Sequence, residues 1–241
     1  MLADKKYTGT LYLIPTSLGS EDLGLFWPSK NTDFINSLNA FIVENIRTAR
    51  RFLKTVGYSK SFDDVRFFLL NKHSNPLDVE TFLQLCLEGT NTGLLSEAGC
   101  PCIADPGQVV VKKAHESGIR VMPLVGPSSI ILALMGSGFN GQNFSFVGYL
   151  PIDKAERVKK IKLLESNATS NNQTQVFMET PFRNNQLIEA LVNNLNPETK
   201  LCVACDITLP SQFIKTLSVT QWKKQMPDLN KRPSIFLLHT R

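Results

Sequence analysis

The sequence predicts an α/β protein made of two domains. In the first half, short apolar runs alternate with amphipathic helical patterns, which is typical of βαβ units and a parallel sheet. Near the end, three apolar runs follow one another almost without helical segments between them, so those strands need not be parallel. The 241 residues are enough for two domains of about half that size. We therefore expect an N-terminal α/β domain at 1–124 and a C-terminal α/β domain at 125–241.

The first half contains five predicted strands separated by helices. Asn75 is placed to cap a helix that begins at Pro76, and Gly57 and Gly89 stand where helices end. The residues between 20 and 40 have weak periodicity and receive no assignment. The expected strands are 10–14, 41–43, 65–70, 92–95 and 119–125, and the expected helices are 44–56, 76–88 and 108–117.

The second half opens with a short apolar helix and closes with strands. Pro127 suits the first position of that helix, at 130–135, and the serines before it suit a helix start. The Asn- and Ser-rich segment 167–173 reads as a polar loop. The other expected elements are strands at 144–150, 175–178, 201–208, 213–219 and 234–239, and helices at 153–166 and around 187–195.

Composition places the chain among ordinary globular proteins, with 42% hydrophobic and 20% charged residues. No apolar run approaches the ~18–20 residues that span a bilayer. Met1–Tyr7 is charged and is followed by no apolar h-region, so no signal peptide is expected. These observations predict a cytoplasmic protein that does not associate with membranes.

The five cysteines predict neither disulfides nor a metal site. An odd number of thiols in a cytoplasmic protein argues against a disulfide framework. Cys202 and Cys205 lie three residues apart on an expected strand, so their side chains point to opposite faces. We therefore expect buried thiols and no bound metal.

The net charge of +5 is clustered. Arg47, Arg50 and Arg51 fall mostly off the apolar face of the helix at 44–56, so they point to solvent or to a ligand. Two further basic clusters lie at 154–162 and 223–232. They are compatible with solvated faces and also with a surface that binds a polyanion.

The stretch from Thr92 to Gly107 is a strand, a loop of small residues and the start of a helix. In open α/β sheets, ligands bind at the carboxyl ends of the strands. Ser96, Ala98 and Gly99 leave the backbone accessible to a ligand. The alternative is an ordinary connector, and Asp105 suits either a turn or a helix cap.

Three other small-residue loops follow expected strands, at 15–20, 126–129 and 179–183. They could converge with the first loop on one cleft. The loop at 126–129 leads into a helix N-terminus, which suits an anionic ligand group. No Gly-x-Gly-x-x-Gly segment follows a strand, so a dinucleotide site of the Rossmann type is disfavoured.

Five motifs carry a family resemblance. They are LYLIPTSLG at 11–19, LLSEAGCPCIADPG at 94–107, GIRVMPLVGPSS at 118–129, FVGYLP at 146–151 and FMETPFR at 177–183. In order and spacing the chain resembles the tetrapyrrole methylase superfamily, and within it the ribosomal RNA small subunit methyltransferase I branch.

The resemblance implies a tetrapyrrole-methylase-like fold of two α/β domains with S-adenosylmethionine in the cleft between them, usually in a homodimer. Small residues would admit this cofactor to the backbone, and carboxylates suit its sulfonium cation. Carried over position by position, the cofactor contacts fall on Pro15, Ser96, Glu97, Ala98, Gly99, Cys100, Ile103, Ser128, Ser129, Glu179 and Ala204.

The resemblance also implies methyl transfer to RNA, most specifically to a ribose 2′-hydroxyl of small-subunit ribosomal RNA. A hydroxyl acceptor needs a base, for which Glu44, Glu97 and Asp105 are the candidates. Arg47, Arg50 and Arg51 are the candidates for binding RNA.

Two alternatives stay open. The first keeps the cofactor and changes the acceptor to a tetrapyrrole-like small molecule or a protein side chain. The second is a module that binds the cofactor without turnover. It rests on Glu44-Asn45-Ile46-Arg47, where the family has Glu-Asp-Thr-Arg.

Overall fold

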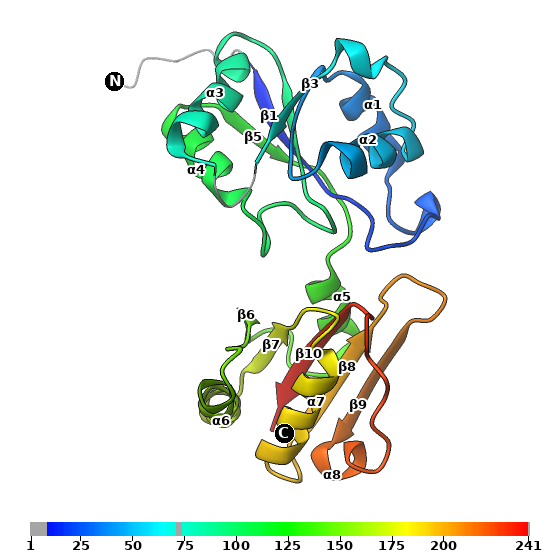
Figure 1. The fold of residues 1–241 in the computed structure, drawn as a ribbon, viewed down its shortest axis with the longest axis vertical. Coiled ribbons are helices and arrows are strands. Elements are labelled where there is room, and N and C mark those ends of the chain that lie inside the picture. Colours follow the sequence, from blue (N-terminus) through cyan, green and yellow to red (C-terminus); the bar gives the residue numbers. More distant parts are fainter. Residues whose placement is uncertain (1–8, 71–73, 241) are drawn as a thin grey trace. The chain divides into compact units, whose positions relative to one another are not determined.

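A computed structural model describes residues 9–70 and 74–240 (Figure 1). The segment Met1–Tyr7, on which the localisation prediction partly rests, lies outside the described residues. The chain divides into two compact units, 1–127 and 128–241, called here the N-terminal and the C-terminal unit. Each unit is built on a five-stranded sheet of its own.

The sheet of the N-terminal unit is parallel, as the alternating sequence pattern predicts, and has the strand order β3-β2-β4-β1-β5. Gly93 lies in the centre of this sheet, where a Cβ atom would come within 2.6 Å of Ile14 Cδ1 and 2.8 Å of Phe41 Cδ1. Only glycine fits there without displacing both neighbours. The strands are β1 (Thr10–Ile14), β2 (Ala40–Val43), β3 (Arg66–Leu69), β4 (Thr92–Leu95) and β5 (Arg120–Pro123).

Helices cover both faces of this sheet, with α1 and α2 on one side and α3 and α4 on the other (Figure 1). Successive residues of β1 enter opposite cores: Tyr12 packs under α1 and α2, and Leu13 packs under α3 and α4. The helices are α1 (Ser29–Asn36), α2 (Ile46–Thr55), α3 (Pro76–Leu87) and α4 (Gln108–Glu116), with short 3-10 turns η1 (Leu23–Leu25) and η2 (Phe62–Asp64).

The sheet of the C-terminal unit is mixed, with the order β6-β7-β10-β8-β9. β6 and β7 are parallel, whereas β10 is antiparallel to both β7 and β8, and β9 is antiparallel to β8. The closing strands are thus antiparallel to their neighbours; a short connection permits this for β8 and β9, whereas β10 pairs with strands that are distant in sequence. The strands are β6 (Phe144–Tyr149), β7 (Thr174–Met178), β8 (Lys200–Cys205), β9 (Phe213–Ser218) and β10 (Ser234–His239).

Helices α6 and α7 pack their apolar residues into one core with this sheet. Phe177 and Phe236 stack across neighbouring strands with ring centroids 6.0 Å apart. Trp222 is fully buried and its Nε1 donates a 2.8 Å hydrogen bond to the carbonyl of Leu201. The helices are α5 (Ser129–Ser137), α6 (Lys154–Asn171), α7 (Asn184–Asn194) and α8 (Val219–Trp222).

One segment without an assignment is structured, and two local predictions were wrong. Residues 20–40, left unassigned, contain η1 and α1. Pro127 is not the first residue of α5, because the Ser128 side chain caps that helix by accepting from the amide of Ile131. Residues 167–171 are helical rather than loop, since Ala168 is buried in the core and carries α6 on to Asn172, which ends it in a left-handed conformation at φ +48°.

No helix within the described ranges is both long enough and apolar enough to cross a membrane.

Candidate functional site

Three loops at the carboxyl ends of β1, β4 and β5 meet in the N-terminal unit. The amide of Thr16 donates to the carbonyl of Gly99 at 2.9 Å, and the Ser96 hydroxyl donates to the same carbonyl at 2.5 Å. The Cys100 thiol donates to the carbonyl of Pro127 at 3.3 Å. The predicted convergence is therefore present for the loops at 15–20, 96–101 and 126–127.

These loops approach so closely that two glycines are required. A Cβ atom on Gly126 would lie 2.1 Å from Cγ of Pro15. Gly99 has φ +71°, and a Cβ atom there would meet the carbonyl oxygen of Pro127 at 3.3 Å. Backbone groups, rather than large side chains, thus form the junction of the loops.

Asp105 holds the rest of the loop before α4. Its carboxylate accepts hydrogen bonds from the amide of Cys102 at 2.9 Å and from the amide of Gly107 at 2.7 Å. Cys102 and Ala104 have positive φ angles of 68° and 62°, which cost energy for residues with a Cβ. Of the two interpretations left open for Asp105, the turn is correct, and Gly107 occupies the cap position of α4.

The three candidate bases lie in one neighbourhood. Glu44 follows β2 directly and is half-buried. Burial raises the pKa of its carboxyl, the charges of Asp105 and Glu97 raise it further, and a hydrogen bond from the backbone of Glu97 partly opposes the shift. Glu97 is exposed and accepts a 2.7 Å hydrogen bond from the Thr48 hydroxyl at the start of α2.

A cavity of about 210 Å³ opens beside Glu97. Residues of the loop after β1 form one wall, and one face of α2 forms the other. Phe26 and Phe52 supply its aromatic surface, and Arg51 and Glu21 also line it.

The three candidate arginines diverge, although they lie within five residues of one another. Arg51 lines the cavity. Arg50 instead lies over the rings of Phe62 and Phe67, at 5.5 and 5.2 Å from their centroids. Arg47 is exposed in the first turn of α2.

Ala98 and Ile103 are exposed in the loop between β4 and α4. The other predicted contacts belong to the C-terminal unit. Ser128 caps α5, and Ser129 is its first residue. Glu179 is buried and accepts 2.6 Å hydrogen bonds from the Arg183 guanidinium and from the amide of Thr180. Ala204 is fully buried within β8.

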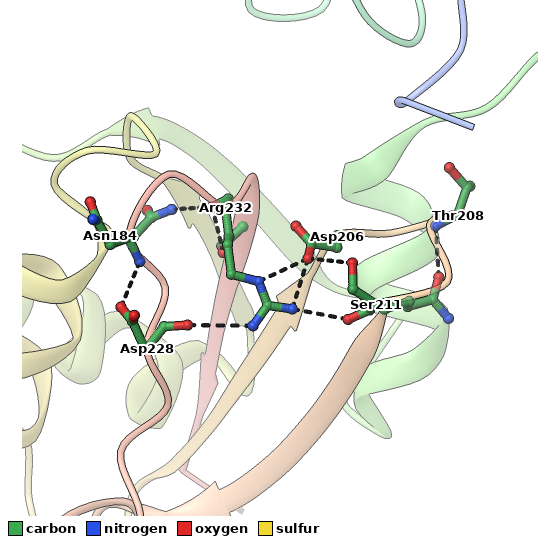
Figure 2. A network of polar contacts seen from close by, with 9 residues as sticks. Asn184, Asp206, Thr208, Ser211, Asp228 and Arg232 are labelled. Carbon is green, nitrogen blue, oxygen red and sulfur yellow. Dashed lines mark hydrogen bonds and ion pairs between the residues drawn. The ribbon is translucent and has the colours of Figure 1, made fainter. Parts of the chain in front are cut away.

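A network of polar contacts lies at the end of β8 (Figure 2). Asp206 accepts from Arg232 Nε at 2.8 Å and from the Ser211 hydroxyl at 2.8 Å. The Arg232 guanidinium also donates to the carbonyl of Ser211 at 2.9 Å, and the Asn184 amide donates to the carbonyl of Arg232 at 2.7 Å. One ion pair thereby fastens the segment after β8 to the segment before β10.

Comparison with known proteins decides the family. No family model matches the chain, but curated relatives do. A protein of Leptospira borgpetersenii, "Ribosomal RNA small subunit methyltransferase I", is 33% identical over 213 residues, which cover 87% of this chain and 79% of the relative. The chain belongs to the ribosomal RNA small subunit methyltransferase I family. Its relatives in Vibrio cholerae and Escherichia coli O157:H7, which bear the same name, are 28% and 29% identical and cover 95% of the chain, with 76% and 77% of their own length matched.

Solved structures confirm the fold of this methyltransferase. The methyltransferase CobJ superposes with a TM-score of 0.62 at 14% identity, covering 96% of this chain and 93% of its own. Uroporphyrin-III-C-methyltransferase from Thermus thermophilus gives 0.58 at 16% identity, covering 96% and 94%. The predicted α/β fold class is therefore confirmed, and the resemblance to the ribosomal RNA small subunit methyltransferase I branch is confirmed by the relatives.

The cysteines of the methyltransferase are held as neutral thiols. Burial raises the pKa of Cys102 to about 12, with Asp105 adding to the shift, and burial raises that of Cys202 to about 11. Across 9–70 and 74–240, no group of three or more His, Cys, Asp or Glu side chains is placed to hold a metal ion.

Sequence reasoning missed Thr48 and the cavity. Thr48 lies four residues after Glu44, a spacing that puts two residues of a helix on one face, but α2 begins only at Ile46, so Glu44 precedes it. Its bond to Glu97 joins residues 49 positions apart, and no local pattern indicates it.

Proposed function

We propose that this chain uses S-adenosylmethionine to methylate a ribose 2′-hydroxyl of small-subunit ribosomal RNA. The observation that carries the proposal is the 33% identity, over 79% of its length, to a relative named for that RNA. The loops that meet beside Glu97 are those on which the resemblance places the cofactor contacts. We further propose a cytoplasmic homodimer, with domains at 1–124 and 125–241.

The residues present fit the proposed cofactor. The backbone around Pro15 and Ser96–Cys100 is held close by hydrogen bonds and lacks bulky side chains, and Ile103 is exposed nearby in sequence. The first amides of α5, at Ser129 and beyond, suit a carboxylate, and we assign Ser128, Glu179 and Ala204 to the same ligand. When bound, S-adenosylmethionine would supply a methyl group carried on a positively charged sulfur, which becomes a neutral thioether when the methyl group is lost.

Glu44 is the best placed of the three acids to take the proton. The Asp105 carboxylate already accepts from two backbone amides, and Glu97 is oriented by Thr48. Held by these loops, S-adenosylmethionine would supply the methyl group to the 2′-oxygen, and the Glu44 carboxylate would take up the hydroxyl proton. A pKa raised toward the working pH makes a carboxylate a better base.

A tetrapyrrole-like acceptor fits the cavity beside Glu97 poorly. The volume of the cavity, about 210 Å³, is below the roughly 300–1,000 Å³ of sites that enclose a whole small molecule. Its charged lining residues are two acids, Glu21 and Glu97, and one base, Arg51. A polycarboxylate would need more positive charge.

The variant Glu44-Asn45-Ile46-Arg47 does not argue for a module without turnover. Asn45 caps α2 by accepting hydrogen bonds from the amides of Arg47 and Thr48. Asp and Asn are equally good in this position. The substitution therefore keeps the helix start that positions Thr48.

Transfer of label from S-adenosylmethionine with a tritiated methyl group tests the proposal. Small subunits lacking the modification and naked small-subunit RNA serve as acceptors. We expect label in RNA at a linkage that resists alkali, because a 2′-O-methyl group removes the hydroxyl that attacks the phosphodiester. No label in either acceptor, with the cofactor bound, would refute it.

A further inference from the structure

The cavity beside Glu97 has the surface of a nucleobase site. The side chain of Phe52 is half-buried there, and its ring packs edge-to-face against Trp27, with ring centroids 5.5 Å apart. Phe26 is 6% exposed and lies in the same lining. A rigid aromatic surface stacks any base, with a typical contribution of about 1–3 kcal/mol per base.

Neutral hydroxyls make up most of the polar lining. Ser17, Ser20, Thr48 and Thr55 face the cavity from its two walls. Hydroxyls both donate and accept hydrogen bonds, so they suit the edge of a base. Most of this polar surface therefore carries no charge.

Among the described residues, Arg51 is the one basic residue of a lining that also carries Glu21 and Glu97, so the lining suits no more than a single phosphate linkage. Arg51 is exposed at the C-terminal half of α2, and its guanidinium matches a phosphodiester. Glu97, another lining residue, accepts a hydrogen bond from Thr48, and its charge contributes to the raised pKa of Glu44. The cavity therefore adjoins Glu44, the acid that is proposed to take the proton.

The size of the cavity sets what enters it. About 210 Å³ corresponds to roughly seven waters of bulk liquid at ≈30 Å³ each, which is the scale of one heterocyclic ring system rather than a nucleotide chain. Proteins that read RNA do so largely on unstacked bases, and enzymes that act on a nucleotide commonly extrude it.

We propose that this cavity holds the base of an RNA nucleotide extruded from the stack, which presents that nucleotide's ribose to Glu44. The proposal rests on the proposed function. Phe52 holds the base, and Arg51 holds a neighbouring phosphate. The Thr48–Glu97 hydrogen bond fixes the wall nearest the reacting hydroxyl.

An RNA with an abasic acceptor ribose tests the proposal with the unaltered protein. Once the labelled position is mapped, two synthetic RNAs are compared, one intact and one lacking only the base at that position. We expect kcat/KM at least about ten-fold lower for the abasic RNA, from the loss of one stacked base. Equal values for both RNAs would overturn the cavity assignment while leaving the proposed function intact.

Filling the cavity gives an independent test. Thr55 is exposed, lines the cavity and bonds the carbonyl four residues earlier at 3.1 Å. Thr81 on α3 is exposed, makes the same bond at 3.0 Å and is absent from the cavity lining. We expect Thr55→Trp to reduce methylation of the intact RNA to the rate of the abasic RNA, and Thr81→Trp to leave it near the wild-type rate.

The two variants and two RNAs together separate the outcomes. With the base already absent, Thr55→Trp should cause little further loss, because both changes remove the same contact. Equal losses on both RNAs, with cofactor binding retained, would contradict the proposal. Failure of the wild-type protein to methylate even intact RNA or small subunits would refute the proposed function itself.

Discussion

The two units use their acids in opposite ways. In the N-terminal unit, Glu44, Glu97 and Asp105 lie close enough to raise the pKa of Glu44, and none of them forms an ion pair within the described residues. In the C-terminal unit, buried Glu179 and Asp206 each pair with an arginine. These paired acids fasten loops, whereas the crowded, unpaired Glu44 stays available to take up a proton.

The largest expected effect is that of Glu44→Gln on turnover. Methyl transfer to RNA should fall about 10²- to 10⁴-fold, because a positioned base is lost. Steady-state and single-turnover labelling measure the loss. Glu189→Gln, an exposed acid of α7, is the control and should keep full activity.

Glu44→Gln should also stabilise the protein at neutral pH. The folded-state pKa of Glu44 lies above its ordinary value of 4.5, so the stability that it contributes is present below that value and is lost as pH rises through the folded pKa. Removal of the charge should therefore raise the melting temperature at neutral pH. A lower melting temperature would show that the charged form is stabilising.

Asp206→Asn should destabilise the protein, whereas Glu44→Gln should stabilise it. The variant loses the ion pair to Arg232, and the free energy of unfolding should fall by about 1.5–3 kcal/mol in a denaturant titration. Glu156→Gln removes the exposed pair with Lys159 in the same unit and should cost less than about 1 kcal/mol. Equal losses in the two variants would mean that the Asp206 pair is no stronger than a surface contact.

Glu97→Gln should reduce turnover by about ten-fold, which is one 1.4 kcal/mol step in activation free energy. The amide loses the charge that faces Glu44 and weakens the bond from Thr48. Thr48→Val, which removes only the hydroxyl, should reproduce part of the loss. If both cofactor binding and turnover stay unchanged in Glu97→Gln, the loop at 94–107 is not the chemical centre.

The smallest expected effect separates two adjacent arginines. Arg51→Gln should weaken RNA binding and reduce the slope of log K against log salt by about 1, as for one lost phosphate contact. Arg50→Gln should leave that slope unchanged and instead cost about 0.5–1 kcal/mol of stability through the lost ring contacts. Fluorescence anisotropy with labelled RNA and thermal melting distinguish the two.

Much of the fold follows from local sequence patterns. Buried parallel strands read as short apolar runs, so β1 and β4 were predicted at their observed bounds. Asn75 and Pro76 mark the start of α3 because a cap and a proline act locally, and the structure shows a capping box there. The strand order is not predictable in this way, since it depends on contacts between distant residues.

The sequence predicted which loops form the candidate site, but not how the side chains within it contact one another. The rule that ligands bind at the carboxyl ends of strands identified the loop at 94–107. It did not show that Asp105 is used in a turn, that Arg50 turns toward Phe62 and Phe67, or that Thr48 reaches Glu97. Each of these outcomes depends on packing between segments that are far apart in sequence.

The pH dependence of single-turnover methylation, measured for the wild type and Glu44→Gln on the same small-subunit RNA, tests the central claim most directly. If Glu44 takes the proton, the wild-type rate should rise with pH through an apparent pKa above 4.5 and then level off. The Glu44→Gln rate should be low and lack that step. The same step in both proteins would show that another group takes the proton and would contradict the account.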